Sequence, residues 1–288
     1  MAYTDDFKRQ VISDATATSN RQAARKHGLN ESTIRNWLAK HKLSSVIKSH
    51  IKPKVGAFNP SGNRVLVIPD LHCPFEHPDS LEFLKAVYIR HKCNMVVCLG
   101  DEADFHHYSR WAKDPDGMGA GKELQQVIQH LQPFYRTFPV VKVCTSNHTV
   151  RPMKLMFEAG LPEAFIPSYE KMLDAPDGWK WADEWQIDGV KYFHGEGKSG
   201  QNGHVQFLKA YKQSLVHGHF HSFAAVSYEG KHFAMNAGCL IDEKAYAFKY
   251  AKHMAIKPSI GAGVVIEGKA AIWRPMHRDD NNRWTGQL

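Results

Sequence analysis

The stretch that decides the fold is Val65 to His72, which reads V-L-V-I-P-D-L-H. Its first four residues form a continuous apolar run, which predicts a short, fully buried β-strand. Asp70 and His72 follow where that strand would end, and their spacing lets both side chains turn towards one point. This stretch therefore predicts two polar ligand side chains on a loop at the end of a buried strand.

Three more clusters of the same kind follow, each just after a short apolar run. Carboxylate, amide and imidazole groups in such numbers are the inventory that a site for two divalent metal ions needs. Asp101 is the best candidate to bridge them, because it ends an apolar strand and Gly100 allows the tight turn that exposes it. A mixed set of N and O donors suits Mn, Fe or Zn. The three clusters are Gly100–Asp101, Ser146–His148, and His194 with His217–His221.

Composition bounds the class of protein. A chain of 288 residues with 43% hydrophobic residues accommodates one large domain and one small one. The net charge of +8 favours polyanionic partners. Five cysteines without a Cys-x-x-Cys pair suggest buried thiols in a reducing cytoplasm. We find no secretory signal or membrane-length apolar run and expect a cytoplasmic protein, with a phage or a mobile element as one origin to consider.

The N-terminal part has the signals of a small helical module. Ser19 is a candidate N-cap for a helix over 20–27, and Gly28 stands at its exit. A further helix is expected over 31–41, so that two helices flank a tight turn. We predict a helix-turn-helix domain over residues 1–43, a polar linker over 44–62 and a second domain over 63–288.

This module resembles the DNA-binding domains of transposases and homeodomain-like proteins, in its small alanines and its S-T-I-R-N-W string at 32–37. The resemblance implies a third helix that enters the major groove of DNA. The alternative is a helical cap that only packs or dimerises. The residues offered to base edges would be Ser32, Thr33, Arg35 and Asn36. The basic flanks are Lys8, Arg9, Arg21, Arg25, Lys26, Lys40 and Lys42.

From residue 64 onward, predicted strands and helices alternate. We expect helices over 79–91, 122–135 and 202–212, and an all-β end with hairpin turns at 228–231 and 267–269. Strands are expected over 65–69, 95–99, 140–144, 191–193, 214–216, 223–228, 231–235, 263–266 and 270–273. This mixture indicates an α/β (α+β) domain of two packed sheets with helices outside.

Five motifs in this order resemble the calcineurin-like metallophosphoesterases over residues 64–275: Asp-x-His, Gly-Asp, Asn-His, a lone His and Gly-His-x-His. A late Asn-x-Gly turn at 236–238 adds to the likeness. The resemblance implies a four-layer αββα sandwich and hydrolysis of phosphate esters by in-line attack of a hydroxide held between two metals. It favours manganese, with Fe, Zn or Ni as alternatives.

The resemblance also implies a role for each motif residue. His148 would be the catalytic histidine, which donates a hydrogen bond or a proton to the leaving oxygen. The first metal would be held by Asp70, His72, Asp101 and His221, and the second by Asp101, Asn147, His194 and His219.

The chain departs from the family pattern in two places. Thr149 stands where the family commonly has an acidic residue that orients the catalytic histidine. Asp104 could take over that role, or the partner could be absent. Some members carry an arginine shortly after Gly-Asp, and Arg110 is a weak candidate to replace it.

Other conspicuous residues have plainer interpretations. We expect His217 to be packed or to support the ligands from behind. His106 and His107 could meet substrate, but we favour a solvated loop at 106–107. Lys198 could reach a substrate phosphate, but we favour an exposed side chain. The G-E-G-K-S-G stretch at 195–200 is not a P-loop, because Tyr192 stands where its first glycine is required. Three tryptophans are a base-stacking platform or, as we prefer, a packed cluster. They are Trp179, Trp181 and Trp185.

The pairing of the two parts favours a phosphoesterase that acts on DNA or is targeted to it, such as a nuclease or DNA phosphodiesterase. One alternative is a general phosphatase or nucleotide phosphodiesterase whose helical domain serves assembly. The other is a DNA-binding regulator with a vestigial phosphoesterase domain, against which the complete set of ligands argues.

Overall fold

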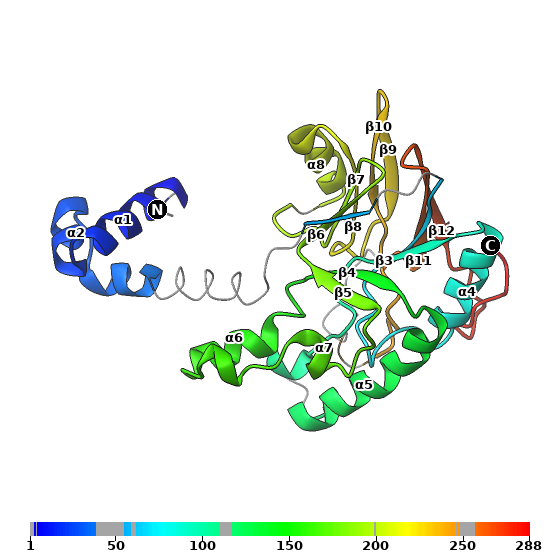
Figure 1. Ribbon diagram of the computed structural model, residues 1–288, viewed down its shortest axis with the longest axis horizontal. Coiled ribbons are helices and arrows are strands. Elements are labelled where there is room, and N and C mark those ends of the chain that lie inside the picture. Colours follow the sequence, from blue (N-terminus) through cyan, green and yellow to red (C-terminus); the bar gives the residue numbers. More distant parts are fainter. Residues whose placement is uncertain are drawn as a thin grey trace.

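The computed structural model describes residues 3, 5–38, 55–58, 62–109, 117–198, 200–245, 247 and 257–288. Two six-stranded β-sheets form the centre of the large domain, and helices lie against their outer faces (Figure 1). One buried cluster lies between the sheets and contains Val65, Val97, Val216 and Met235. The expected αββα sandwich of sheets and helices is therefore confirmed.

The first sheet has the strand order β12-β11-β2-β3-β4-β5, and β2 to β5 run parallel to one another. Parallel strands present their carboxyl ends at the same edge of a sheet, so the segments that follow β2, β3 and β4 meet there. The strands are β2 (Arg64–Ile68), β3 (Met95–Cys98), β4 (Val141–Cys144), β5 (Trp179–Ala182), β11 (Gly261–Ile266) and β12 (Ala270–Pro275).

The second sheet has the order β1-β6-β7-β8-β10-β9, in which β7, β8 and β10 are parallel. The segments after β7 and β8 therefore also leave the sheet at a common edge. The strands are β1 (Val55–Phe58), β6 (Glu184–Ile187), β7 (Val190–Phe193), β8 (Ser214–His217), β9 (Ala225–Glu229) and β10 (His232–Asn236).

Strand β2 shows why the opening apolar run has no polar alternation. Val65 and Val67 pack between the two sheets, whereas Leu66 and Ile68 pack under the helices of the first sheet. All four side chains are at most 1% exposed. A strand buried on both faces requires an uninterrupted apolar sequence, and the polar side chains begin where the strand ends.

The helices complete the layers. α4 contacts β2, α7 contacts β5, and α8 packs on the strands β8, β9 and β10 of the second sheet. None of the helices that the structure describes is long and apolar enough to cross a membrane. Their bounds are α4 (Ser80–Arg90), α5 (Ala120–Thr137), α6 (Arg151–Glu158), α7 (Tyr169–Met172) and α8 (Gly203–Tyr211), with 3-10 turns η1 (His106–Tyr108) and η2 (Glu163–Phe165).

The N-terminal part contains α1 (Asp5–Ala17), α2 (Asn20–His27) and a helical stretch over 31–38. The Oγ of Ser19 accepts a hydrogen bond from the backbone N–H of Gln22 at 3.2 Å, and Gly28 ends the helix with φ +63°. The predicted cap, helix and exit glycine are therefore confirmed. The remainder of the predicted helix over 31–41, and the proposed boundary at 43, lie outside the described residues.

The structure corrects the sequence prediction at two places. β1 lies inside the stretch predicted to be a linker and pairs in parallel with β6. The strands β5 and β6, which contain the three tryptophans, were not predicted. Trp179 is fully buried, and Trp181 and Trp185 are each 8% exposed, so the packing interpretation of these residues is confirmed. Both predicted hairpin turns join paired antiparallel strands.

Candidate metal centre

The loops that carry the predicted ligands have an unusual backbone. His72, Asp101 and His219 all adopt the left-handed conformation, with φ of +54°, +49° and +68°. Residues other than glycine rarely adopt it, and such strain concentrates at functional sites. A Cβ atom on Gly100, whose φ is +95°, would lie 2.7 Å from the backbone oxygen of Cys144. The turn before Asp101 therefore requires glycine.

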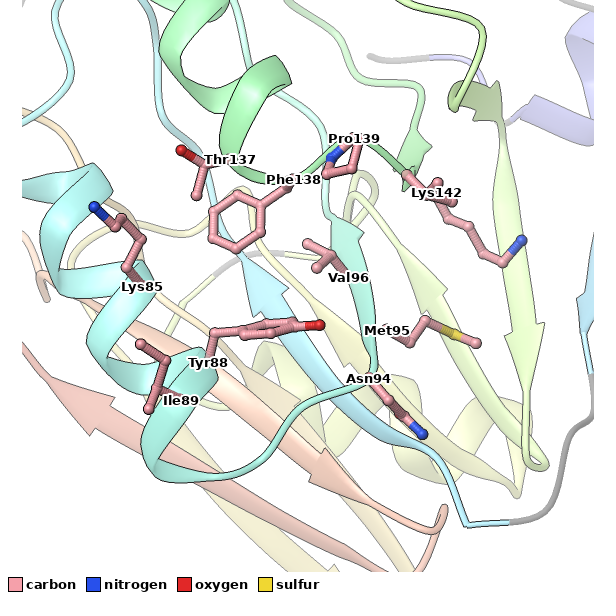
Figure 2. Close-up of a pocket in the computed structure, with 11 residues that line it drawn as sticks. Lys85, Tyr88, Ile89, Asn94, Met95, Val96, Thr137, Phe138, Pro139 and Lys142 are labelled. Carbon is pink, nitrogen blue, oxygen red and sulfur yellow. The ribbon is translucent and has the colours of Figure 1, made fainter.

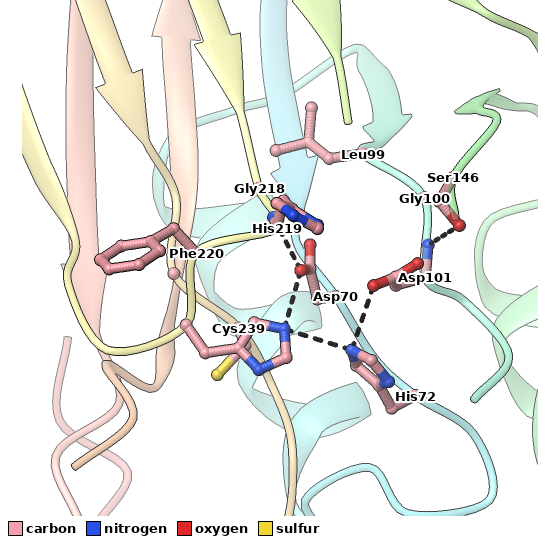
Figure 3. Close-up of polar contacts among 12 residues, drawn as sticks. Asp70, His72, Leu99, Gly100, Asp101, Ser146, Gly218, His219, Phe220 and Cys239 are labelled. Carbon is pink, nitrogen blue, oxygen red and sulfur yellow. Dashed lines mark hydrogen bonds and ion pairs between the residues drawn. The ribbon is translucent and has the colours of Figure 1, made fainter. Parts of the chain in front are cut away.

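A first cluster of donor atoms forms around Asp70, His72, Asp101 and His221. Figure 3 shows the first three of these side chains pointing towards one another. The Nε2 atom of His221 lies 2.9 Å from Oδ2 of Asp70 and 3.2 Å from Nε2 of His72. The same His72 nitrogen lies 3.4 Å from Oδ2 of Asp101. The structure thus brings together the four residues assigned to the first metal by resemblance.

A second cluster lies on the other side of Asp101. The Nε2 atom of His194 lies 3.4 Å from Oδ2 of Asp101, 2.9 Å from Oδ1 of Asn147 and 3.0 Å from Nδ1 of His219. One carboxylate oxygen of Asp101 is therefore at the same distance from Nε2 of His72 and from Nε2 of His194. The two clusters meet at this atom.

The protonation pattern tests whether these residues fit cations. The Nδ1 atom of His194 lies 3.0 Å from the backbone oxygen of Leu99, which can only accept a hydrogen bond. Nδ1 of His72 likewise faces Oδ1 of Asp104 at 2.6 Å. In a neutral ring each Nε2 then carries a lone pair, directed towards other acceptors. Spacings of 2.9–3.4 Å suit neighbouring ligands of an ion bound at about 2.1 Å, so the residues fit two divalent metals.

The pKa shifts of these residues are consistent with metal binding. Burial lowers the pKa of His219 to about 4, which keeps its ring neutral and able to act as a ligand. Burial acts to raise the pKa of Asp101, but the rings of His148, His194 and His72 outweigh it and hold that pKa well below its ordinary value. Neutral imidazoles and ionised carboxylates are the forms that bind metal ions.

His148 lies beside the first cluster. Its Nδ1 atom is 2.7 Å from the backbone oxygen of Asp104 and 3.2 Å from the carboxylate Oδ1 of the same residue. Its Nε2 atom is 3.8 Å from Oδ2 of Asp101. Burial lowers the pKa of His148, but the carboxylates of Asp101 and Asp104 outweigh it and raise that pKa above its ordinary value. Asp104 is thus the acidic residue beside this ring.

Thr149, which stands where the family commonly has an acid that orients the catalytic histidine, contacts Ser146. Its Oγ1 lies 2.6 Å from Oγ of Ser146, which in turn accepts the backbone N–H of Asp101 at 3.0 Å. Thr149 therefore braces the loop that holds Asp101. The predicted Asn-x-Gly turn braces another loop, because Nδ2 of Asn236 donates to the backbone oxygen of Phe220 at 3.0 Å.

One residue at the site was not predicted. The Nη2 atom of Arg151 lies 2.8 Å from Nε2 of His148, and its Nη1 donates to the backbone oxygen of Asp104 at 2.9 Å. The only sequence signal is a cation three residues after the predicted catalytic histidine. Arg110, the candidate named from the family pattern, lies outside the described residues, as do Lys40 and Lys42.

The plainer predictions have mixed outcomes. His217 is 2% exposed with Nδ1 at 2.8 Å from the backbone oxygen of Gly218, so its packed role is confirmed. Lys198 is exposed, as expected. The prediction of a solvated loop at His106 and His107 is wrong. Both lie half-buried on η1, where their backbone N–H groups donate to the carboxylate of Glu123.

The predicted DNA-contact residues lie on the helical stretch over 31–38. Ser32, Arg35 and Asn36 are exposed, and Thr33 is half-buried. Ile34 is fully buried in the small N-terminal core and fixes which face of this helix points inwards. The structure therefore leaves most of the predicted contact face accessible.

A separate cavity of about 470 Å³ lies at the start of β3 and near the end of α5 (Figure 2). Its lining includes Tyr88, Val96 and Phe138, with Lys85 and Lys142 as its cations. No carboxylate, histidine or cysteine is among its described lining residues, so it lacks the ligand types that gather at the strand ends.

Comparisons with known proteins give distant structural likenesses. No family model matches the chain, and no curated protein matches it. Among solved structures, a Vps29 variant from Entamoeba histolytica is 14% identical and covers 74% of this chain and 99% of its own, with a TM-score of 0.34. Yfce, a phosphoesterase from E. coli, is 15% identical over 70% and 87%, with a TM-score of 0.37.

The nuclease MPE of Pseudomonas putida is 13% identical and covers 73% of this chain and 86% of its own, with a TM-score of 0.32. These scores and identities are low. The function proposed below therefore rests on the arrangement of side chains at the candidate metal centre.

Proposed function

We propose that this chain is a phosphoesterase that depends on two divalent metal ions and acts on DNA phosphodiesters. The observation that carries the proposal is the position of Asp101 Oδ2, 3.4 Å from Nε2 of both His72 and His194. A shared carboxylate between two nitrogen-rich donor sets supports a two-metal hydrolytic site. Manganese is the metal we favour, with Fe, Zn or Ni as alternatives.

The metals, when bound, would supply an activated water and neutralise charge on the phosphoryl oxygens. The chain's own residues would do the rest. His148 would donate a hydrogen bond or a proton from Nε2 to the leaving oxygen. Asp104 would hold the ring of His148 through its backbone oxygen, at 2.7 Å from Nδ1. Its carboxylate would at the same time fix the ring of His72 at 2.6 Å.

The N-terminal helices support DNA as the target. Exposed Ser32, Arg35 and Asn36 share a helix that follows a tight turn after α2, with Ile34 buried behind it. A net charge of +8 also favours a polyanionic substrate. We therefore propose that the first three helices carry the hydrolytic domain to DNA. We also propose that the protein is cytoplasmic.

Hydrolysis of chromogenic phosphate esters tests the catalytic part. The manganese-loaded full chain should hydrolyse a bis-aryl phosphodiester, and His148→Ala should lower kcat by about 10²–10⁴-fold. Asp101→Asn should abolish turnover, because it removes the shared carboxylate. Asp174→Asn is the matched control, since Asp174 is exposed and lies outside both donor clusters. Absence of turnover with every divalent metal would favour a regulator with an inactive domain.

DNA binding tests the targeting part. The full chain should bind duplex DNA with an affinity that falls as salt rises. Arg35→Ala should weaken it more than Lys231→Ala, which removes the same charge from an exposed hairpin turn. Ester hydrolysis without DNA binding at moderate salt would favour a general phosphatase or nucleotide phosphodiesterase.

A further inference from the structure

Arg151 places a guanidinium beside the candidate metal centre, in contact with the ring of His148 and with the backbone of Asp104. Its Nη1 donates to the backbone oxygen of Asp104 at 2.9 Å, and its Nη2 lies 2.8 Å from Nε2 of His148. The first partner is a backbone carbonyl and the second is an imidazole nitrogen, so neither is a carboxylate. Among the residues that the structure describes, no Asp or Glu forms an ion pair with Arg151. Within the described part of the chain, its positive charge is therefore available to an anion.

The hydrogen bonds of His148 show which of its two ring nitrogens contacts the guanidinium of Arg151. The backbone oxygen of Asp104 lies 2.7 Å from Nδ1 of His148 and can only accept a hydrogen bond, so Nδ1 carries a proton. Nε2 is then the acceptor for Arg151. This nitrogen lies 3.8 Å from Oδ2 of Asp101, at the junction of the two donor clusters. Arg151 therefore contacts the ring atom that would face the leaving oxygen of a substrate.

The backbone of α6 holds Arg151 close to His148. Arg151 is the first residue of α6, and its backbone N–H donates to the backbone oxygen of His148 at 3.0 Å. Two of the five N–H donors of the guanidinium are used by Asp104 and His148. The remaining donors keep the fork geometry that matches the oxygens of a phosphate.

We propose that Arg151 binds a phosphate oxygen of the substrate on the leaving-group side of the site. In the free chain its Nη2 rests on Nε2 of His148. A phosphate group takes over that donor, and Nε2, released from Arg151, can then take up the proton that it would donate to the leaving oxygen. This inference rests on the proposed phosphoesterase function and adds a substrate-binding side chain to it.

Titration of the manganese-loaded full chain with inorganic phosphate, followed by calorimetry, tests the inference directly. Arg151→Met should weaken phosphate binding by about tenfold or more, because it removes a charged donor. Arg151→Lys should recover part of the loss. Arg136→Met is the matched control, because Arg136 is exposed at the end of α5, and it should stay within about twofold of wild type.

Two further readouts separate substrate binding from a structural role. The melting temperature and the manganese content of Arg151→Met should match those of wild type, while its KM for a phosphodiester rises by about tenfold. Unchanged phosphate affinity in Arg151→Met would overturn the inference. So would a loss of bound manganese that Arg151→Lys does not restore. A chain that binds phosphate through Arg151 but hydrolyses no ester would refute the proposed function alone.

Discussion

The carboxylate of Asp104 lies 2.6 Å from Nδ1 of His72 and is the nearest ionised neighbour of that ring. Since the same residue also faces His148, one buried side chain positions both a predicted metal ligand and the predicted catalytic histidine. Asp104 is 2% exposed, so neither contact competes with bulk water.

Replacement of Asp104 by Asn should therefore affect metal binding and turnover together. The amide keeps the size of the side chain but loses the charge that favours an Nδ1 proton on His72. We expect manganese affinity and kcat each to fall by about 10–100-fold, measured by metal titration and by diester hydrolysis. Normal metal affinity in Asp104→Asn would show that the contact with His72 is incidental.

Gly218 should tolerate no side chain. A Cβ atom at this position would lie 2.1 Å from Oδ1 of Asp70, whose other oxygen accepts the backbone N–H of His219 at 2.8 Å. Gly218→Ala should displace Asp70 and greatly weaken manganese binding. Gly121→Ala is the control, because a Cβ there meets nothing within 4 Å, and should leave metal content and melting temperature unchanged or slightly improved.

The C-terminal segment should be clamped in a pH-dependent way. Asp79 accepts hydrogen bonds from the guanidinium of Arg283 and from the backbone N–H of Trp284. The Arg283 bond lowers the pKa of Asp79 to about 2, against about 3.9 for a free Asp. A lowered pKa stabilises the fold above the free value, and that contribution is lost as pH falls towards 2.

Comparison of Asp79→Asn with wild type isolates this contribution. Above about pH 5 the variant should be less stable by about 0.5–1 kcal/mol in urea denaturation, because the exposed Arg283 is screened by solvent. The difference should shrink as pH falls towards 2. Equal stability of the two proteins at neutral pH would contradict the clamp.

The cysteines should be inert in the folded chain. All five are free and buried, and burial raises the pKa of Cys93 to about 12. Because the thiolate is the reactive form, an aromatic disulfide reagent should modify none of them quickly in the native protein. All five should react after denaturation. Rapid modification of even one native thiol would place it at an accessible surface instead.

The sequence allowed the four ligand-bearing loops to be predicted, because each follows a strand whose apolar run ends at a polar residue. The topology then explains their convergence, since the parallel strands β2, β3 and β4 share one carboxyl edge. Arg151 could not be predicted in the same way. Its approach to His148 depends on how α6 begins, and no periodicity encodes that distance.

Strand β1 was hidden for a related reason. Its sequence, Val55–Phe58, is short and contains a glycine, so local composition indicates a linker. Its pairing partner β6 lies more than a hundred residues further along the chain, and only tertiary structure selects that register. The sequence left open whether Asp104 or no residue takes the place of the orienting acid. The contacts of Asp104 with Nδ1 of His148 decide between these alternatives.

We propose that Asp101 is shared by two metal ions, and electron paramagnetic resonance of the manganese-loaded chain tests this most directly. Wild type should bind two manganese ions per chain and give the spectrum of an exchange-coupled pair, which Asp101→Asn should lose. A single ion per chain, or two ions that give only the signal of isolated manganese, would show that Asp101 is not shared by two metals.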